Sequence, residues 1–237
     1  VLWLQHKHSD LSAANTYWRE SLRFLKPAVS QTSLAPENWE AGIETHKLLL
    51  ETDITEALGR VAKDWKVTSN IIIQGLWANL LARLQGTQHP AFGTILSGRS
   101  AEITDVDSII GMMINTVPVQ LQVAESGSFS DWARGLQQMS IQREEHGYLS
   151  LAEIKKAINF QPESEMFNTL YVMNNYPLED LIGNDCDANT LDIRNIESIQ
   201  ETNYELLLHV VLSDGQLQFT WRYDNTVYTA LDIQHLS

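Results

Sequence analysis

The strongest local signal in the sequence is a pair of apolar segments joined by the dipeptide Asp214-Gly215. Segments 204–212 and 216–223 flank this dipeptide, which favours a two-residue β-hairpin turn. In the second segment, large apolar residues alternate with polar ones: Leu217, Phe219 and Trp221. A period of two places one face of a strand against a core and the other in water. The chain must therefore contain an antiparallel sheet with one buried face, and we expect these three side chains to face helices.

The rest of the sequence alternates between helical and extended patterns. Strands are expected at 42–51, 91–96 and 168–175. Helices are expected over 11–25, from Asp53 to Trp65, from Thr68 or Ser69 to Leu84 with Gly86 as its C-cap, and from Ser128 or Ser130. Two more are expected from Ser150 to about Ile158, with Ser150 and Glu153 as a capping box, and from about Thr226. The helix at 71–84 is apolar on too many sides for a surface helix, so it should be largely buried. Interleaved helices and strands predict an α/β or α+β two-layer sandwich with a mixed central sheet flanked by helices.

Composition narrows the class of protein. The chain has 237 residues, 43% of them apolar, with 16 Lys and Arg against 30 Asp and Glu, a net charge of −14. This content excludes a disordered chain, and the negative charge argues against nucleic acid as a partner. No apolar run reaches the roughly 20 residues that span a bilayer, so no membrane partner is expected. The single cysteine, Cys186, cannot form an internal disulfide, which favours a cytoplasmic location.

The residues alone show no complete catalytic set. His6-x-His8 lacks further metal ligands and fits a solvated segment better than a metal site. Acidic neighbours raise the pKa of a thiol, so Cys186 is a poor nucleophile. Glu144-Glu145 is more typical of a solvated helix face than of an acid/base pair. His209, between apolar neighbours, is expected to be a partly buried sheet histidine with a hydrogen-bond partner rather than a catalytic base.

Three stretches, in this order, carry a family resemblance. They are 92–99 followed by 110–119, His146 with 149–154, and 166–172 with 174–177. Together they resemble the C-terminal half of the condensation domain of nonribosomal peptide synthetases, a chloramphenicol-acetyltransferase-like superfamily. Segments 3–5 and 17–22 are similar to the stretch that joins the two halves of such domains. The order and spacing of these motifs make the resemblance specific, and it covers essentially the whole chain.

The resemblance implies a fold and an activity. Such domains have two acetyltransferase-like lobes with a tunnel between them, where donor and acceptor peptidyl carrier proteins deliver acyl groups on 4′-phosphopantetheine arms for amide bond formation. The family's His-His-x-x-x-Asp-Gly motif lies in the N-terminal lobe, and no such string occurs in this sequence. Residues 1–237 are thus expected to be the C-terminal lobe, with 1–40 as a connecting helix and loop and 41–237 as the acyltransferase-like lobe. The N-terminal lobe of the same domain and an adjacent adenylation domain are the implied partners.

The resemblance also implies a set of site residues. The expected tunnel wall comprises Ser97, Gly98, Arg99, Gly111, Asn115 and Thr116, with no catalytic residue, no metal and no directly bound cofactor. Four of these residues have a structural alternative. Gly98 and Arg99 could form a tight turn with an ion pair, Asn115 could make a cap or turn bond at a strand start, and Gly111 suggests a bend in tight packing. The chain has Met112-Met113 where the family often has Phe.

Several functions remain open at this point. The lobe could belong to an epimerization, heterocyclization or dual-function domain, or it could be a non-catalytic module that docks carrier proteins. Without the His motif the fragment alone is expected to be inactive. One surface is expected to be unusually apolar or to expose a strand edge, needing its missing partner or driving self-association. Segment 159–166 is the candidate for crossing to the neighbouring lobe.

Overall fold

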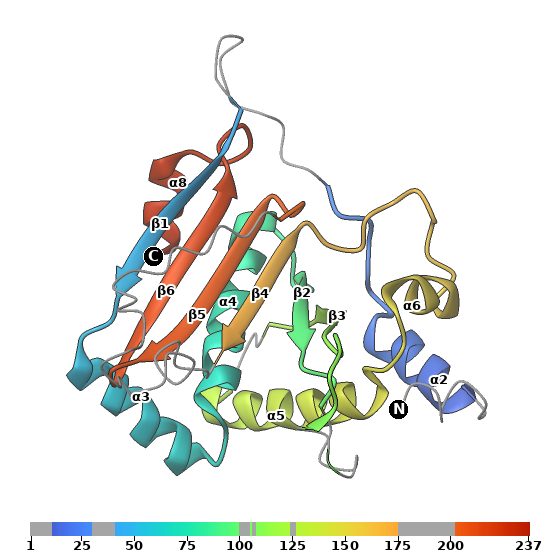
Figure 1. Cartoon of the computed structure of the whole chain (residues 1–237), viewed down its shortest axis with the longest axis horizontal. Coiled ribbons are helices and arrows are strands. Elements are labelled where there is room, and N and C mark those ends of the chain that lie inside the picture. The colour runs from blue at the N-terminus through green and yellow to red at the C-terminus, as the bar shows by residue number, and fades with distance from the viewer. Residues whose placement is uncertain (1–10, 30–40, 100–104, 106–107, 124–126, 175–201) are drawn as a thin grey trace, which may run out of the picture. The chain divides into compact units, whose positions relative to one another are not determined.

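The computed structural model describes residues 11–29, 41–99, 105, 108–123, 127–174 and 202–237 (Figure 1). The chain forms two compact units. The first unit comprises Val1–Gln31 with Leu58–Tyr171, and the second comprises Thr32–Ala57 with Val172–Ser237. The chain passes between them within helix α3 (Thr52–Trp65) and within strand β4 (Thr169–Asn174).

The second unit contains the predicted hairpin. Strand β5 (Leu206–Ser213) pairs antiparallel with β6 (Gln216–Asp224), and β1 (Ile43–Leu49) pairs antiparallel with the other edge of β6. Asp214 and Gly215 both have positive φ, 50° and 74°, as a type I′ turn requires. Leu217 and Trp221 are buried as expected, whereas Phe219 is only half-buried.

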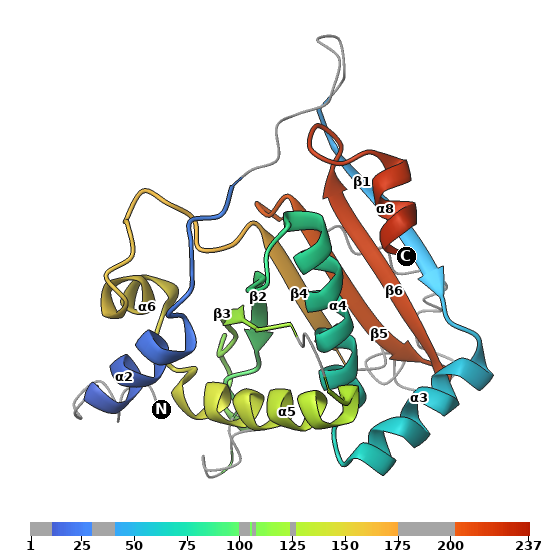
Figure 2. The same ribbon diagram turned by 180° about the vertical axis from the view of Figure 1, so that it is seen from behind.

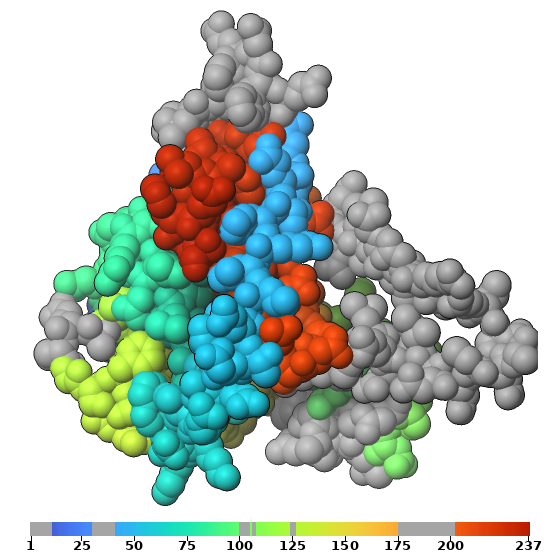
Figure 3. Space-filling view, turned by 90° about the vertical axis from the view of Figure 1, so that its left-hand side faces the viewer, coloured from blue at the N-terminus to red at the C-terminus, as the bar shows by residue number. Residues whose placement is uncertain are grey.

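Helix α8 (Ala230–Leu236) packs next to β1 on one face of these strands (Figure 2). Strand β1 lies at the surface along its whole length (Figure 3). The expected start of the last helix at Thr226 was wrong. The backbone N–H and hydroxyl of Thr226 both donate to Asp224 Oδ1 in a turn, and Thr229 caps the helix instead, with its hydroxyl accepting from the Asp232 N–H.

The first unit contains the mixed part of the sheet. Strand β2 (Ala91–Leu96) pairs antiparallel with β3 (Asn115–Gln120) and parallel with β4, giving the order β4-β2-β3. The parallel pairing matches Gly93 with Leu170 and Thr94 with Tyr171. The prediction of a mixed sheet flanked by helices is therefore confirmed.

Helix α4 (Ser69–Gln85) is the buried helix that the sequence predicted, and it packs against α5 (Phe129–His146). The Thr68 hydroxyl accepts from the Ile71 N–H at its start, and Gly86 ends it at φ 61°. Leu76, however, is 50% exposed, so the helix is not buried all round. Helix α3 is also only partly covered, because Ile54 is 48% exposed.

Helices α2 (Ser12–Ser21) and α6 (Leu151–Ala157) pack together in the first unit. Trp18 Nε1 donates to the His146 carbonyl at 3.1 Å, and Arg19 Nε donates to the Ala157 carbonyl at 2.9 Å. The capping box of Ser150 and Glu153 is present as predicted. These contacts dock the segment before residue 29 onto the turn that follows α5 and onto the end of α6.

Segment 159–166, the candidate for crossing to the neighbouring lobe, is bonded to its own unit near both ends. Asn159 takes a left-handed conformation at φ 54°, and the Phe160 N–H bonds back to the Lys155 carbonyl, which closes the end of α6. The Ala28 N–H donates to the Glu165 carbonyl, and Met166 is buried. Backbone pairing and burial of Met166 hold this segment against its own unit.

Several expectations fall outside the described residues. They concern residues 3–5, His6, His8, residues 175–177 and Cys186. Within the described part of the chain, no helix is long and apolar enough to cross a bilayer.

Candidate substrate-tunnel site

The predicted site residues come together at one end of the β2–β3 pair. Ser97, Gly98 and Arg99 follow β2 directly, and Asn115 and Thr116 begin β3. Because the two strands are antiparallel and Leu96 is paired with Asn115, the end of one strand meets the start of the other. The residues quoted separately from the sequence therefore belong to one site in the first unit.

Gly98 allows a close backbone approach that any other residue would block. Its φ is +66°, a conformation that L side chains rarely adopt. A Cβ at this position would lie 2.0 Å from the Met113 carbonyl oxygen. Gly98 thus fixes the 97–99 turn against the segment that precedes β3.

Arg99 holds the same segment from a second point. Its Nη2 donates to the Ile109 carbonyl at 3.2 Å, and its backbone N–H donates to Ser97 Oγ at 3.3 Å. The turn of residues 97–99 therefore contacts segment 109–113 at both ends, at the Ile109 carbonyl and at the Met113 carbonyl.

Asn115 links this site to the second motif. Its Nδ2 donates to the carbonyls of Gly147 and Leu149, at 2.7 and 2.8 Å. Gly147 itself packs closely, because a Cβ there would lie 2.2 Å from Leu96 Cδ1. Both amide hydrogens of Asn115 are thus used to fasten the turn between α5 and α6 to β3. No described residue donates a hydrogen bond to its Oδ1.

Gly111 and Thr116 have simpler roles. Gly111 adopts φ +152°, a backbone conformation that favours glycine. A Cβ there would meet nothing within 4 Å, so the expected tight packing was wrong and only the backbone conformation explains the residue. Thr116 lies half-buried in β3 opposite Ile95.

The sequence did not lead us to predict one unusual residue, the buried Arg143. Arg143 of α5 is only 4% exposed, and its nearest polar partner is Gln74 Oε1 at 3.4 Å from Nη2. Its Nε has no hydrogen-bond partner, and no described carboxylate forms an ion pair with it. Burial lowers the pKa of this guanidinium, while the charges of Tyr17 and Glu144 oppose that effect. One sequence signal for its burial was available: Arg143 lies four residues after Met139, on the apolar face of α5.

The acid/base candidates behave as their structural readings predicted. Asn174 Nδ2 lies 3.3 Å from His209 Nε2, and partial burial lowers the pKa of His209. Glu144 and Glu145 are exposed. Among the described residues, no group of three His, Cys, Asp or Glu side chains could hold a metal.

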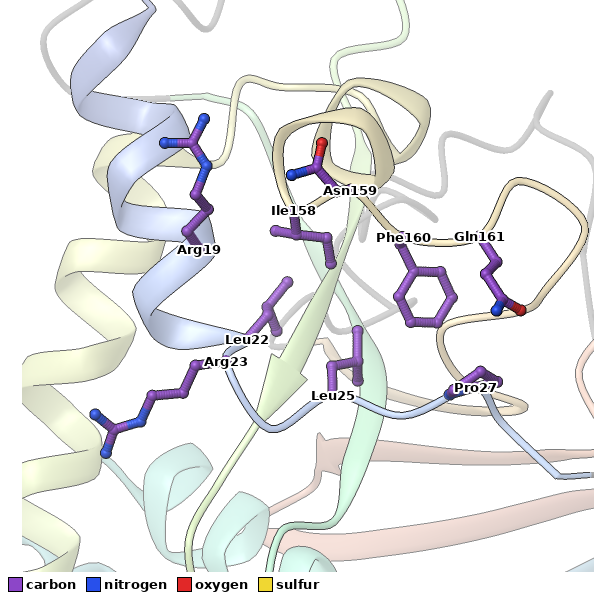
Figure 4. Close-up of a pocket in the computed structure, with 9 residues that line it drawn as sticks. All are labelled: Arg19, Leu22, Arg23, Leu25, Pro27, Ile158, Asn159, Phe160 and Gln161. Carbon is purple, nitrogen blue, oxygen red and sulfur yellow. The ribbon is translucent and has the colours of Figure 1, made fainter.

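A pocket of about 270 Å³ lies elsewhere in the first unit, between the end of α2 and the turn after α6 (Figure 4). Leu22, Leu25, Ile158 and Phe160 give it an apolar lining, and Arg19 and Arg23 stand at one side. None of the predicted tunnel residues lines it.

Comparisons with known proteins identify the family of the chain. The family model described as "Condensation domain" matches residues 1–237. The chain is 32% identical over 216 residues to chondramide synthase cmdD of Chondromyces crocatus, covering 89% of this chain and 5% of that protein. It is 32% identical over 221 residues to surfactin synthase subunit 3 of Bacillus subtilis (strain 168), covering 92% of this chain and 17% of that protein.

A solved structure shows the same fold. The condensation domain from the monacolin K polyketide synthase MokA superposes with a TM-score of 0.76 at 13% identity, covering 99% of this chain and 57% of that one. The chain thus spans a small part of the curated relatives and little more than half of this domain. From its sequence and its fold together, the chain belongs to the condensation-domain family.

Proposed function

We propose that the chain is the C-terminal lobe of a nonribosomal peptide synthetase condensation domain, with residues 1–40 as the connecting segment and 41–237 as the acyltransferase-like lobe. The family match over the whole chain carries this proposal. The convergence of the motifs at the β2–β3 site supports it, because Asn115 joins two stretches that are distant in sequence.

The reaction is aminolysis of a thioester. The acceptor amine attacks the donor carbonyl, the C–N bond forms, the C–S bond breaks, and the sulfur leaves as the phosphopantetheine thiol while the amine loses a proton. The arms arrive with donor and acceptor carrier proteins as part of the substrates, after an adenylation domain has activated the amino acids. Holding two tethered reactants in register supplies much of the rate.

In this proposal the lobe contributes a wall of the tunnel. Ser97, Gly98 and Arg99 set the backbone of segment 109–113, and Gly111 shapes it further. Asn115 and Thr116 begin the strand behind it, and Asn115 Oδ1 is placed to accept a hydrogen bond from an amine or amide N–H. These are positioning residues, and proton transfer is left to the other lobe.

The test is amide formation by the complete synthetase module with two aminoacyl-loaded carrier proteins, followed by intact-mass spectrometry of the carriers. Asn115→Ala should slow dipeptide formation at least 10-fold, whereas Asn79→Ala, which loses one local bond within α4, should leave it unchanged. Residues 1–237 alone should give no product above carriers without the domain. An inverted amino acid without a new bond, a product that has lost water to a ring, or carrier binding without any product would point to epimerization, heterocyclization or docking and would overturn the proposal.

A further inference from the structure

Three large aliphatic side chains of one short segment are exposed to solvent. Ile110 is 101% exposed, Met112 92% and Ile114 61%. They occupy alternate positions of residues 110–114. We refer to Ile110, Met112 and Ile114 as the apolar row. Single exposed apolar residues are ordinary, but a contiguous exposed group marks a surface that is covered by something else.

The backbone that carries the row is held at three points. The Met113 carbonyl lies against Gly98, the Ile109 carbonyl accepts from Arg99, and Asn115 is fastened to the turn after α5. The segment therefore has a fixed conformation. A partner that packs on the row loses little binding free energy to conformational entropy, because this backbone is already ordered.

The composition of the segment indicates an apolar partner. Residues 108–116 contain no charged side chain, in a chain whose net charge is −14. A charged peptide would gain no ion pair here and would lose hydration. The partner surface is therefore apolar and uncharged where it meets the row.

The size of the row indicates a partner in the same polypeptide. Three side chains offer far less than the ~800 Å² per partner that a stable interface between separate molecules needs. A tethered neighbour has a high effective concentration and can use a small contact. The chain spans 57% of the solved condensation domain to which it is similar, so such a domain contains a large neighbouring part that these residues do not include.

We propose that the apolar row is an interdomain contact: it packs against the part of the condensation domain that residues 1–237 do not include, rather than facing substrate in the tunnel. This inference rests on the proposed function for the existence of that neighbour. The loop then has two roles. Gly98, Arg99 and Asn115 fix its backbone, and the apolar row packs against the other lobe.

The test measures thiol accessibility. Met112→Cys and, separately, Ile114→Cys are made in a Cys186→Ser background, in residues 1–237 and in the protein that contains the complete domain. N-ethylmaleimide labelling of both should be at least 10-fold slower in the complete domain. Leu231→Cys on α8, 58% exposed in the second unit, is the control and should label equally in both proteins. Equal unfolding midpoints of the variants exclude loss of the fold.

The alternatives give different results. Labelling at 112 that stays as fast in the complete domain as in the shorter chain would overturn the inference. Labelling that slows only when loaded carrier proteins are added would show that the row faces substrate, which overturns the inference and leaves the proposed function intact. Labelling of the shorter chain that slows with its own concentration would show self-association instead. Slower labelling at 112 and 114 in a complete domain that forms no amide would refute the proposed function but would support the interdomain contact.

Discussion

Removal of the Asn115 side chain should destabilise the protein through the turn between α5 and α6. Asn115→Ala deletes two hydrogen bonds, to the Gly147 and Leu149 carbonyls at 2.7 and 2.8 Å. Each such bond contributes about 1 kcal/mol net, and a buried acceptor left without a donor costs more. Asn115 itself is half-buried, so water can replace part of the loss. The expected decrease in the free energy of unfolding is therefore about 2–3 kcal/mol.

Urea denaturation of residues 1–237 followed by tryptophan fluorescence measures this change. With an m-value of about 3 kcal/mol/M, the midpoint should fall by roughly 0.7–1 M. Asn79→Ala is the matched control, because it removes one local bond to the Gly75 carbonyl inside α4 and gains helix propensity, so its midpoint should barely move. A loss below about 0.5 kcal/mol for Asn115→Ala would show that the two bonds do not fasten the turn.

Three further predictions concern other residues. Gly98→Ala should cost at least about 2 kcal/mol in the same urea assay, because its Cβ would meet the Met113 carbonyl, and an unchanged midpoint would contradict the close approach. Arg143→Met should leave the free energy of unfolding unchanged or raise it by about 1 kcal/mol, since it removes a buried charge without an ion pair, and a clear loss would reveal a missed partner. His209 has a lowered pKa in the folded state, so its contribution is present above pH ~6.5 and is lost as pH falls below that value. His209→Gln should therefore flatten the decline in urea midpoint between pH 7 and 5, and parallel pH profiles would refute the assignment.

The local elements followed from the sequence because their signals are local. Alternation around Asp214-Gly215 gave the hairpin, since positive φ at both positions suits this dipeptide. The capping box of Ser150 and Glu153 and the cap of α4 at Thr68 depend on residues three apart, so they could be read directly. The family motifs are also short local stretches, and the family match confirms the resemblance that they carry.

The roles of the site residues depended on contacts between distant parts of the chain. No local pattern shows that the amide of Asn115 reaches residues 147 and 149, or that Gly98 faces the carbonyl of Met113. The buried position of Arg143 and the return of segment 159–166 onto residue 28 likewise arise from packing between separate helices and turns. Sequence periodicity determined which residues form each element, whereas tertiary packing decided which backbone groups meet, because hydrogen bonds between residues far apart along the chain leave no periodic trace.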